Sequence, residues 1–162
     1  MKKYLLLATL FISSCAVDKV GEPYRGWKAG EMDIHHIYTG RGESNFMIFP
    51  DATSMLVDAG DHDPAYEKFP YMTKALPDNS RRAGEWIARY ILRVNPHAEK
   101  VDYMMLSHFH SDHMGEIDHG ELTSGRNPDY KLTGLAHVGE WIRFGMAYDR
   151  GYPDYNYPTK IG

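Results

Sequence analysis

Six positions near the middle of the chain constrain its fold and chemistry more than any other stretch. They contain His108, His110, Asp112 and His113, and they follow an apolar run at residues 101–106 that is typical of a buried strand. In an extended segment His108 and His110 point to the same side, and the other two follow where the chain turns. Imidazole and carboxylate are usual ligands of catalytic zinc. The pattern therefore predicts two metal ions, one held by His108 and His110 and the other by Asp112 and His113.

The remaining pattern of apolar residues predicts an α/β domain. Strands are expected at residues 32–38, 45–49, 55–58, 101–106 and 144–148. The second and third should form a hairpin, because Pro50–Thr53 suits a type I turn. A helix should run from a cap at Asn79 or Ser80 to Asn95-Pro96, and another over residues 133–142. The arginines of the first helix, which are Arg81, Arg82, Arg89 and Arg93, are expected on its solvated face.

The N-terminus has the pattern of a bacterial lipoprotein signal. Lys2 and Lys3 precede an apolar stretch, Tyr4–Ile12, that is too short to span a bilayer. Ile12-Ser13-Ser14-Cys15 then resembles the lipobox, which implies cleavage before Cys15, lipidation of its sulfur and attachment to a membrane of the cell envelope. Residues 1–14 would be the signal peptide, 15–30 a polar tether and 31–162 the domain. An ordinary signal peptide followed by a chance cysteine is the alternative.

Charge and cysteine content exclude two further possibilities. The chain of 162 residues has a formal net charge of −4, so it is not expected to bind nucleic acid strongly through bulk charge. Cys15 is the only cysteine, and a disulfide within the mature chain is therefore impossible. An exported protein of this kind must be held together by its apolar core or by metal.

A second carboxylate is expected beside the metals. Leu56-Val57-Asp58-Ala59-Gly60 places Asp58 at the end of an aliphatic strand. A carboxylate at such a strand end can accept the N–H of a ligand imidazole and so fix its tautomer. Asp58 could instead be an ordinary turn-forming residue. Asp58 and Asp112 are the candidate catalytic residues, and Asp112 could orient the attacking water.

These motifs resemble those of the metallo-β-lactamase fold superfamily. The resemblance covers about residues 32–149, and Gly40-Arg41-Gly42-Glu43-Ser44 makes it most similar to the hydrolase-like domain of DNA-uptake competence proteins. It implies the N-terminal half of an αββα sandwich and a hydrolase that activates water with two zinc ions, with manganese or iron as alternatives. A phosphodiester is the first substrate class it suggests, and a small-molecule lactone or β-lactam is the second.

The chain departs from the family after His113. The family needs a further histidine for the first ion, then an aspartate and a last histidine for the second. Here only His119 and His137 follow, the first too close to the loop and the second in a helical stretch where a packing or surface role is expected. His62 could line the cleft. We therefore expect an incomplete domain that binds metal weakly, and a non-catalytic metal-binding or partner-docking lipoprotein is the alternative function.

Overall fold

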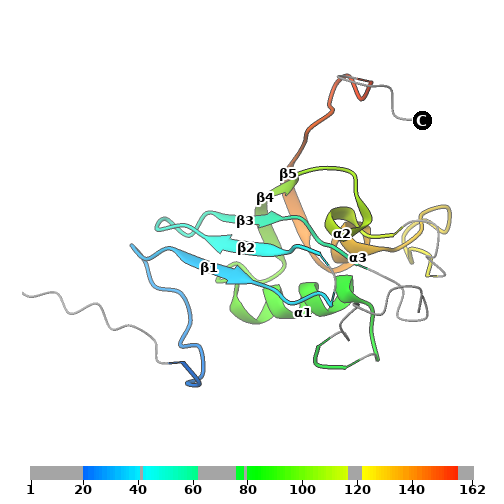
Figure 1. Cartoon of the computed structure of the whole chain (residues 1–162). Coiled ribbons are helices and arrows are strands. Elements are labelled where there is room, and N and C mark those ends of the chain that lie inside the picture. Colours follow the sequence, from blue (N-terminus) through cyan, green and yellow to red (C-terminus); the bar gives the residue numbers. More distant parts are fainter. Residues whose placement is uncertain (1–19, 41, 62–75, 79, 117–121, 157–162) are drawn as a thin grey trace, which may run out of the picture.

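The computed structural model describes residues 20–40, 42–61, 76–78, 80–116 and 122–156. The predicted signal peptide, Cys15, His62 and His119 lie outside these residues. In the described part, five strands form a single mixed sheet accompanied by three helices (Figure 1). The predicted α/β class is confirmed at this level.

The strands lie side by side in the order in which they occur in the chain. The first three, β1 (Asp33–His36), β2 (Asn45–Ile48) and β3 (Ser54–Val57), are antiparallel, whereas β4 (Lys100–Leu106) and β5 (Arg143–Asp149) continue the sheet parallel to β3. All five predicted strands are present, with ends close to the expected positions. The β2–β3 hairpin is also confirmed, and its turn is closed by Phe49 N–H donating to the Thr53 carbonyl at 2.8 Å.

Two helices cover one face of the sheet. α1 (Ala83–Val94) lies in the chain between β3 and β4, and α3 (Gly134–Trp141) lies between β4 and β5. The two helices pack against each other (Figure 1). Their apolar sides form one core with the sheet, which includes Phe46, Ile48, Leu56, Ile87, Ala88, Ile91, Val101, Val138 and Ile142. This layer holds the strand ends that carry the candidate site.

The predicted start of α1 is wrong. The backbone N–H of Ser80 bonds to the Asp78 carboxylate at 2.8 Å, so the chain makes a local turn there before the helix begins. The N-cap is Arg82, whose side chain makes no capping bond. Arg82 is not on the solvated face either, because its guanidinium pairs with the buried carboxylate of Asp61 at 3.1 Å. Asn79 is outside the described residues.

The end of the predicted tether is docked on the domain. Trp27 packs against the core, and its indole N–H donates to the Glu31 carbonyl at 2.7 Å. Gly30 N–H donates to the Pro50 carbonyl at 2.8 Å, which fastens this segment to the β2–β3 turn. The ordered contacts of the domain thus begin before residue 31.

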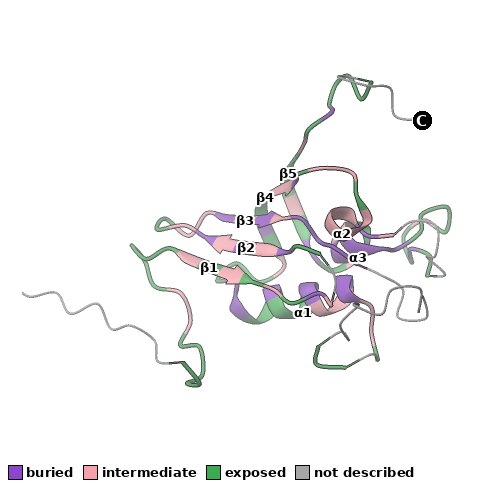
Figure 2. Cartoon of the chain, viewed as in Figure 1, coloured by how far each residue is buried: buried purple, intermediate pink, exposed green. Residues whose placement is uncertain are grey.

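The other face of the sheet carries apolar side chains that remain accessible. One row crosses all five strands in register, through Ile34, Met47, Met55, Tyr103 and Met146. Ile34 is 53% exposed and Met146 is 52% exposed, so no described helix covers the outer ends of this row (Figure 2). Among the described residues, no helix has the length and hydropathy needed to cross a bilayer.

Candidate metal centre

The parallel pairing of β3 and β4 brings the residues of the candidate site together at one edge of the sheet. Asp58 directly follows β3, and Ser107 and His108 directly follow β4, its parallel neighbour. The carboxyl ends of neighbouring parallel strands meet at the same edge, where α/β proteins commonly bind ligands. The loop then enters α2 (Ser111–Met114), a single helical turn.

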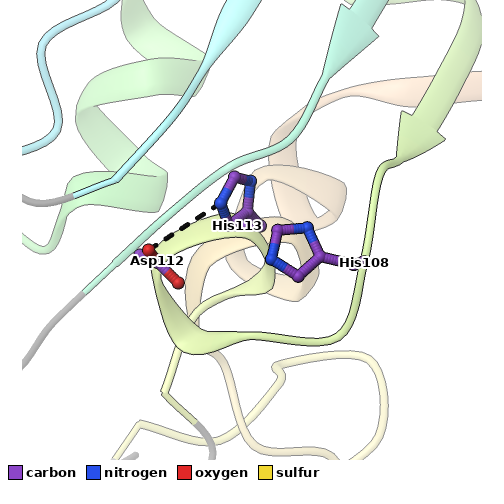
Figure 3. Close-up of side chains that lie close together, drawn as sticks. All are labelled: His108, Asp112 and His113. Carbon is purple, nitrogen blue, oxygen red and sulfur yellow. Dashed lines mark ion pairs between the residues drawn. The ribbon is translucent and has the colours of Figure 1, made fainter.

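Three of the predicted ligands converge at this edge. His108, Asp112 and His113 each offer one ligand atom, and these atoms all lie within 4.8 Å of one another (Figure 3). Figure 3 also shows the ion pair between His113 Nε2 and an Asp112 carboxylate oxygen, which are 3.7 Å apart. Three protein ligands are the usual number at a catalytic zinc. Within the described residues, this is the one group of three or more such donors that could hold a metal ion.

The turn of α2 explains which residues meet. The His110 carbonyl accepts the backbone N–H groups of His113 and Met114, both at 2.9 Å, which starts the turn. This turn carries His113 back over His108, so that the two ring centroids are 3.9 Å apart. A metal ion between the two imidazoles would therefore bridge residues that the sequence assigned to different ions.

His110 lies beside the group without belonging to it. Its Nδ1 is 3.1 Å from His108 Nε2, so the two imidazoles do point to the same side, as the alternation of an extended segment predicts. The grouping nevertheless differs from the predicted pairs, because His108 joins Asp112 and His113 while His110 stands apart.

Asp58 has the contacts predicted for a carboxylate that orients a ligand. One oxygen lies 2.8 Å from His113 Nδ1, and the side chain also accepts the backbone N–H of Ser107 at 2.8 Å and its hydroxyl at 2.6 Å. Asp58 is buried, so these bonds are shielded from water. With Nδ1–H donated to Asp58, His113 keeps its Nε2 lone pair for a metal.

Ser107 is a site residue that the sequence did not single out. Its hydroxyl donates to Asp58, and its oxygen lies 3.0 Å from His108 Nδ1 and 3.3 Å from His113 Nδ1. The oxygen can accept the Nδ1–H of His108, which leaves the lone pair on Nε2 of that ring, the atom that faces His110 Nδ1. Its position between the strand and His108 could have pointed to it, but a serine at the end of a strand is common and does not by itself indicate a site.

The glycine-rich loop braces the turn of α2 from outside. Glu43 N–H donates to the Asp112 carbonyl at 2.8 Å. A Cβ on Gly42 would lie 1.8 Å from that same carbonyl oxygen, and the φ of Gly42 is +87°. Only glycine allows the loop to approach this closely. The motif singled out in the sequence thus supports Asp112 through backbone contacts.

The other histidines of the described region do not join the site. His137 is buried between α3 and α1, which favours packing over the surface role that the sequence also allowed. Burial lowers its pKa below the ordinary value of 6.5 despite nearby Asp61. On β1, His35 packs on Phe46 and lies 3.0 Å from the Tyr90 hydroxyl, whereas the next residue, His36, is exposed. Both β1 histidines therefore behave as the alternation of a strand predicts.

Asp149, at the end of β5, lies at the same edge of the sheet but is occupied by its own turn. Its carboxylate accepts the backbone N–H groups of Gly151 and Tyr152, both at 2.8 Å, and the Tyr155 hydroxyl at 2.8 Å. The backbone bonds are the main reason that the pKa of Asp149 is held below its ordinary value. This carboxylate terminates the strand.

Comparison with protein-family models, curated proteins and solved structures finds no match to this chain. The chemistry must therefore be judged from the donor set. Two imidazoles with their Nδ1 atoms engaged by Ser107 and Asp58, and one accessible carboxylate, form a set that suits a divalent cation. The site could hold a metal ion.

Proposed function

We propose that this chain is a metal-dependent hydrolase of the metallo-β-lactamase superfamily type. The observation that carries the proposal is the convergence of His108, Asp112 and His113, with both imidazoles oriented by hydrogen bonds on their far sides. Such outer contacts are a regular feature of metal-ligating histidines. A chance cluster of surface histidines would not need a buried aspartate behind it.

The proposal assigns a role to each side chain. His108, Asp112 and His113 would hold a zinc ion, and His110 would contribute to a second ion; manganese or iron could replace zinc. A bound divalent cation supplies Lewis acidity and lowers the pKa of a coordinated water towards neutrality. Asp112, whose side chain is more exposed than that of His113, would also orient the attacking water, and Asp58 would keep His113 in the ligating tautomer.

The open sheet face supports the finer fold assignment. A parallel sheet is normally covered on both faces, and two sheets pack through apolar side chains in a sandwich. The row from Ile34 to Met146 is apolar along its whole length and is uncovered by any described helix. We therefore favour the N-terminal half of an αββα sandwich over a complete two-layer domain.

Substrate class is the least constrained part of the proposal. A phosphodiester is favoured by the similarity of the glycine-rich loop to that of competence proteins, and a lactone or β-lactam is the second choice. A non-catalytic metal-binding or partner-docking lipoprotein is the competing function. It is favoured by the single three-donor group among the described residues, since a two-ion hydrolase site needs more ligands.

Metal content and hydrolysis should be measured together on the full chain. Zinc affinity, measured by titration, and cleavage of bis(p-nitrophenyl) phosphate would be compared for the wild type, His108→Ala and Ser111→Ala. A hydrolase should bind zinc and turn over substrate, lose both in His108→Ala and keep both in Ser111→Ala. Zinc binding without hydrolysis of phosphodiester, lactone or β-lactam substrates would favour the non-catalytic function. Absence of zinc binding would contradict the hydrolase and the metal-binding alternative, and would leave partner docking.

The lipid anchor is proposed independently of the site. We infer from the lipobox that Cys15 carries the anchor and holds the protein in the cell envelope. Cys15→Ser should move the protein from the membrane fraction to the soluble fraction and abolish incorporation of labelled palmitate. If the variant still fractionates with membranes and the wild type incorporates no label, the anchor is wrong.

A further inference from the structure

Asp61 is a buried carboxylate that the proposed chemistry does not use. It lies three residues after Asp58 and is 1% exposed. Its oxygens accept bonds from Arg82 Nε at 3.2 and 3.3 Å, and Arg82 Nη2 is 3.1 Å from one of them. The same oxygen accepts the backbone N–H of Gly134 at 3.2 Å. Asp61 therefore ties the chain leaving β3 to the first residues of both covering helices.

The backbone of the same segment holds residues 107–114, which we call the ligand loop. Ala59 N–H donates to the His113 carbonyl at 2.7 Å, and Asp61 N–H points to the Ser111 carbonyl at 3.4 Å. Between them, Gly60 N–H donates to the Glu43 carbonyl at 2.9 Å, in the loop that braces Asp112. Residues 58–61, which we call the exit segment, thus contact the ligand loop at successive positions. A shift of the exit segment would reach His113 through Ala59 and Ser111 through Asp61.

The packing around Gly134 leaves little room for such a shift to be absorbed. A Cβ on Gly134 would lie 2.3 Å from the Ala59 carbonyl oxygen and 2.4 Å from that of Met114. The start of α3 therefore lies directly against both the exit segment and the end of α2. Tightly packed elements transmit a displacement to their neighbours because no void can take it up.

The buried ion pair between Asp61 and Arg82 joins the exit segment to the start of α1, and its burial costs desolvation free energy. Its desolvation often cancels the attraction between the charges, so the benefit is commonly orientation rather than stability. The guanidinium of Arg82 binds carboxylate with a fixed planar geometry, which suits a positioning role. The charge of the Asp61 carboxylate also acts on the neighbouring His137, where it opposes the larger effect of burial on the pKa of that imidazole.

We propose that Asp61 is a positioning residue for the ligand loop, which sets the place of His113 relative to His108 through its bonds to Arg82 and Gly134. This inference rests on the proposed metal site. It goes beyond that site by locating the control of ligand geometry in the buried layer behind it, in residues that contact no ligand atom.

The test compares two changes of carboxylate to amide in the full chain. Asp61→Asn removes the charge from the buried pair. Glu85→Gln is the matched control, because Glu85 pairs with Arg81 and Arg89 near the start of α1 but does not contact the ligand loop. Arg82→Lys is a milder third variant that keeps a positive charge without the planar fork. Co²⁺ affinity, the Co²⁺ absorption spectrum and the unfolding temperature of the metal-free chain would be measured for each.

We expect Asp61→Asn to weaken Co²⁺ binding about 10-fold, at the lower end of the range for residues that support metal ligands. Its Co²⁺ spectrum should change as well, and Arg82→Lys should follow in the same direction by a smaller factor. Glu85→Gln should change affinity less than about 2-fold, well below that range. Equal affinities and spectra for Asp61→Asn and wild type would overturn the proposal, as would equal losses in Asp61→Asn and Glu85→Gln.

A metal-independent measurement separates this proposal from the metal site itself. Two-bond ¹H–¹⁵N correlation spectra of the histidine rings report the tautomer of His113 in the metal-free chain. Asp61→Asn should convert a single Nδ1–H tautomer into a mixture of tautomers, whereas Glu85→Gln should not. If the wild type binds no Co²⁺, the proposed function fails, and an unchanged His113 tautomer would then refute the positioning role on its own.

Discussion

The ligand loop and the exit segment lie against each other but differ sharply in their surroundings. The loop presents donors that water can reach, with the Asp112 side chain 41% exposed. In the exit segment, Asp58, Ala59 and Asp61 are all buried. Exposed side chains rotate at little cost, so the loop alone would not fix ligand positions to the accuracy that a metal site needs. The comparison teaches that the geometry of the site is set from its buried side.

The largest effect should come from removing a donor of the three-residue group. We expect His108→Ala to weaken zinc binding by more than about 100-fold, beyond the range for supporting residues. His110→Ala should spare the first ion and remove only the second, because His110 stands outside the group. Zinc stoichiometry and titration would check this. Equal losses of bound zinc in His108→Ala and His110→Ala would favour the pairing predicted from the sequence, in which His108 and His110 hold one ion.

Asp58→Asn tests the exit segment directly. The variant keeps the size of the side chain but loses the charge that orients His113, so affinity or turnover should fall about 10–100-fold. Zinc titration would measure the loss of affinity, and turnover at saturating zinc would measure the loss of rate. Ser111→Ala serves as the control in the loop, because no bond from its hydroxyl holds a ligand. Wild-type behaviour of Asp58→Asn would show that the exposed loop orients itself.

The contact between the exit segment and α3 can be disturbed without replacing a polar side chain. Gly134→Ala would force a Cβ against the Ala59 and Met114 carbonyls at a φ of +42°, and we expect a loss of about 2 kcal/mol in the free energy of unfolding. Gly139→Ala is the control on the same helix, because its Cβ would meet nothing within 4 Å. Urea unfolding should show that variant unchanged or slightly more stable.

The smallest effect is a pH dependence from the layer behind the exit segment. Burial lowers the pKa of His137, and that of His35, below the ordinary value of 6.5. As the pH falls through 6.5 the unfolded chain takes up protons first, so the free energy of unfolding should decrease towards lower pH. His137→Gln should remove part of this slope, by less than about 1.4 kcal/mol per pH unit. Urea unfolding between pH 8 and 5.5 would measure it; an unchanged slope would contradict the prediction.

Most of the fold could be predicted because local pattern decides it. The strands, the hairpin and the two longer helices follow from alternation, turn residues and helical spacing. The burial of the Arg82 side chain could not be predicted in this way, because its partner Asp61 is 21 residues away in the chain. Contacts of this kind between distant residues leave no mark on local spacing.

Three of the four predicted ligands come together in the structure, but their grouping was not predicted. Alternation correctly placed His108 and His110 on one side. It could not show that a single turn at residues 111–114 would bring His113 back over His108. The role of Asp58 beside His113 followed from its place at a strand end, whereas Ser107 and Asp61 are visible only in three dimensions.

The uncovered sheet face has a chemical consequence as well as a structural one. Met47, Met55 and Met146 lie in its central row, and Met146 is half exposed. Accessible thioethers are oxidised readily to sulfoxides, which are polar and chiral and pack poorly in an apolar layer. Oxidation of these methionines would therefore make this face more polar, and it would weaken any layer that packs against it.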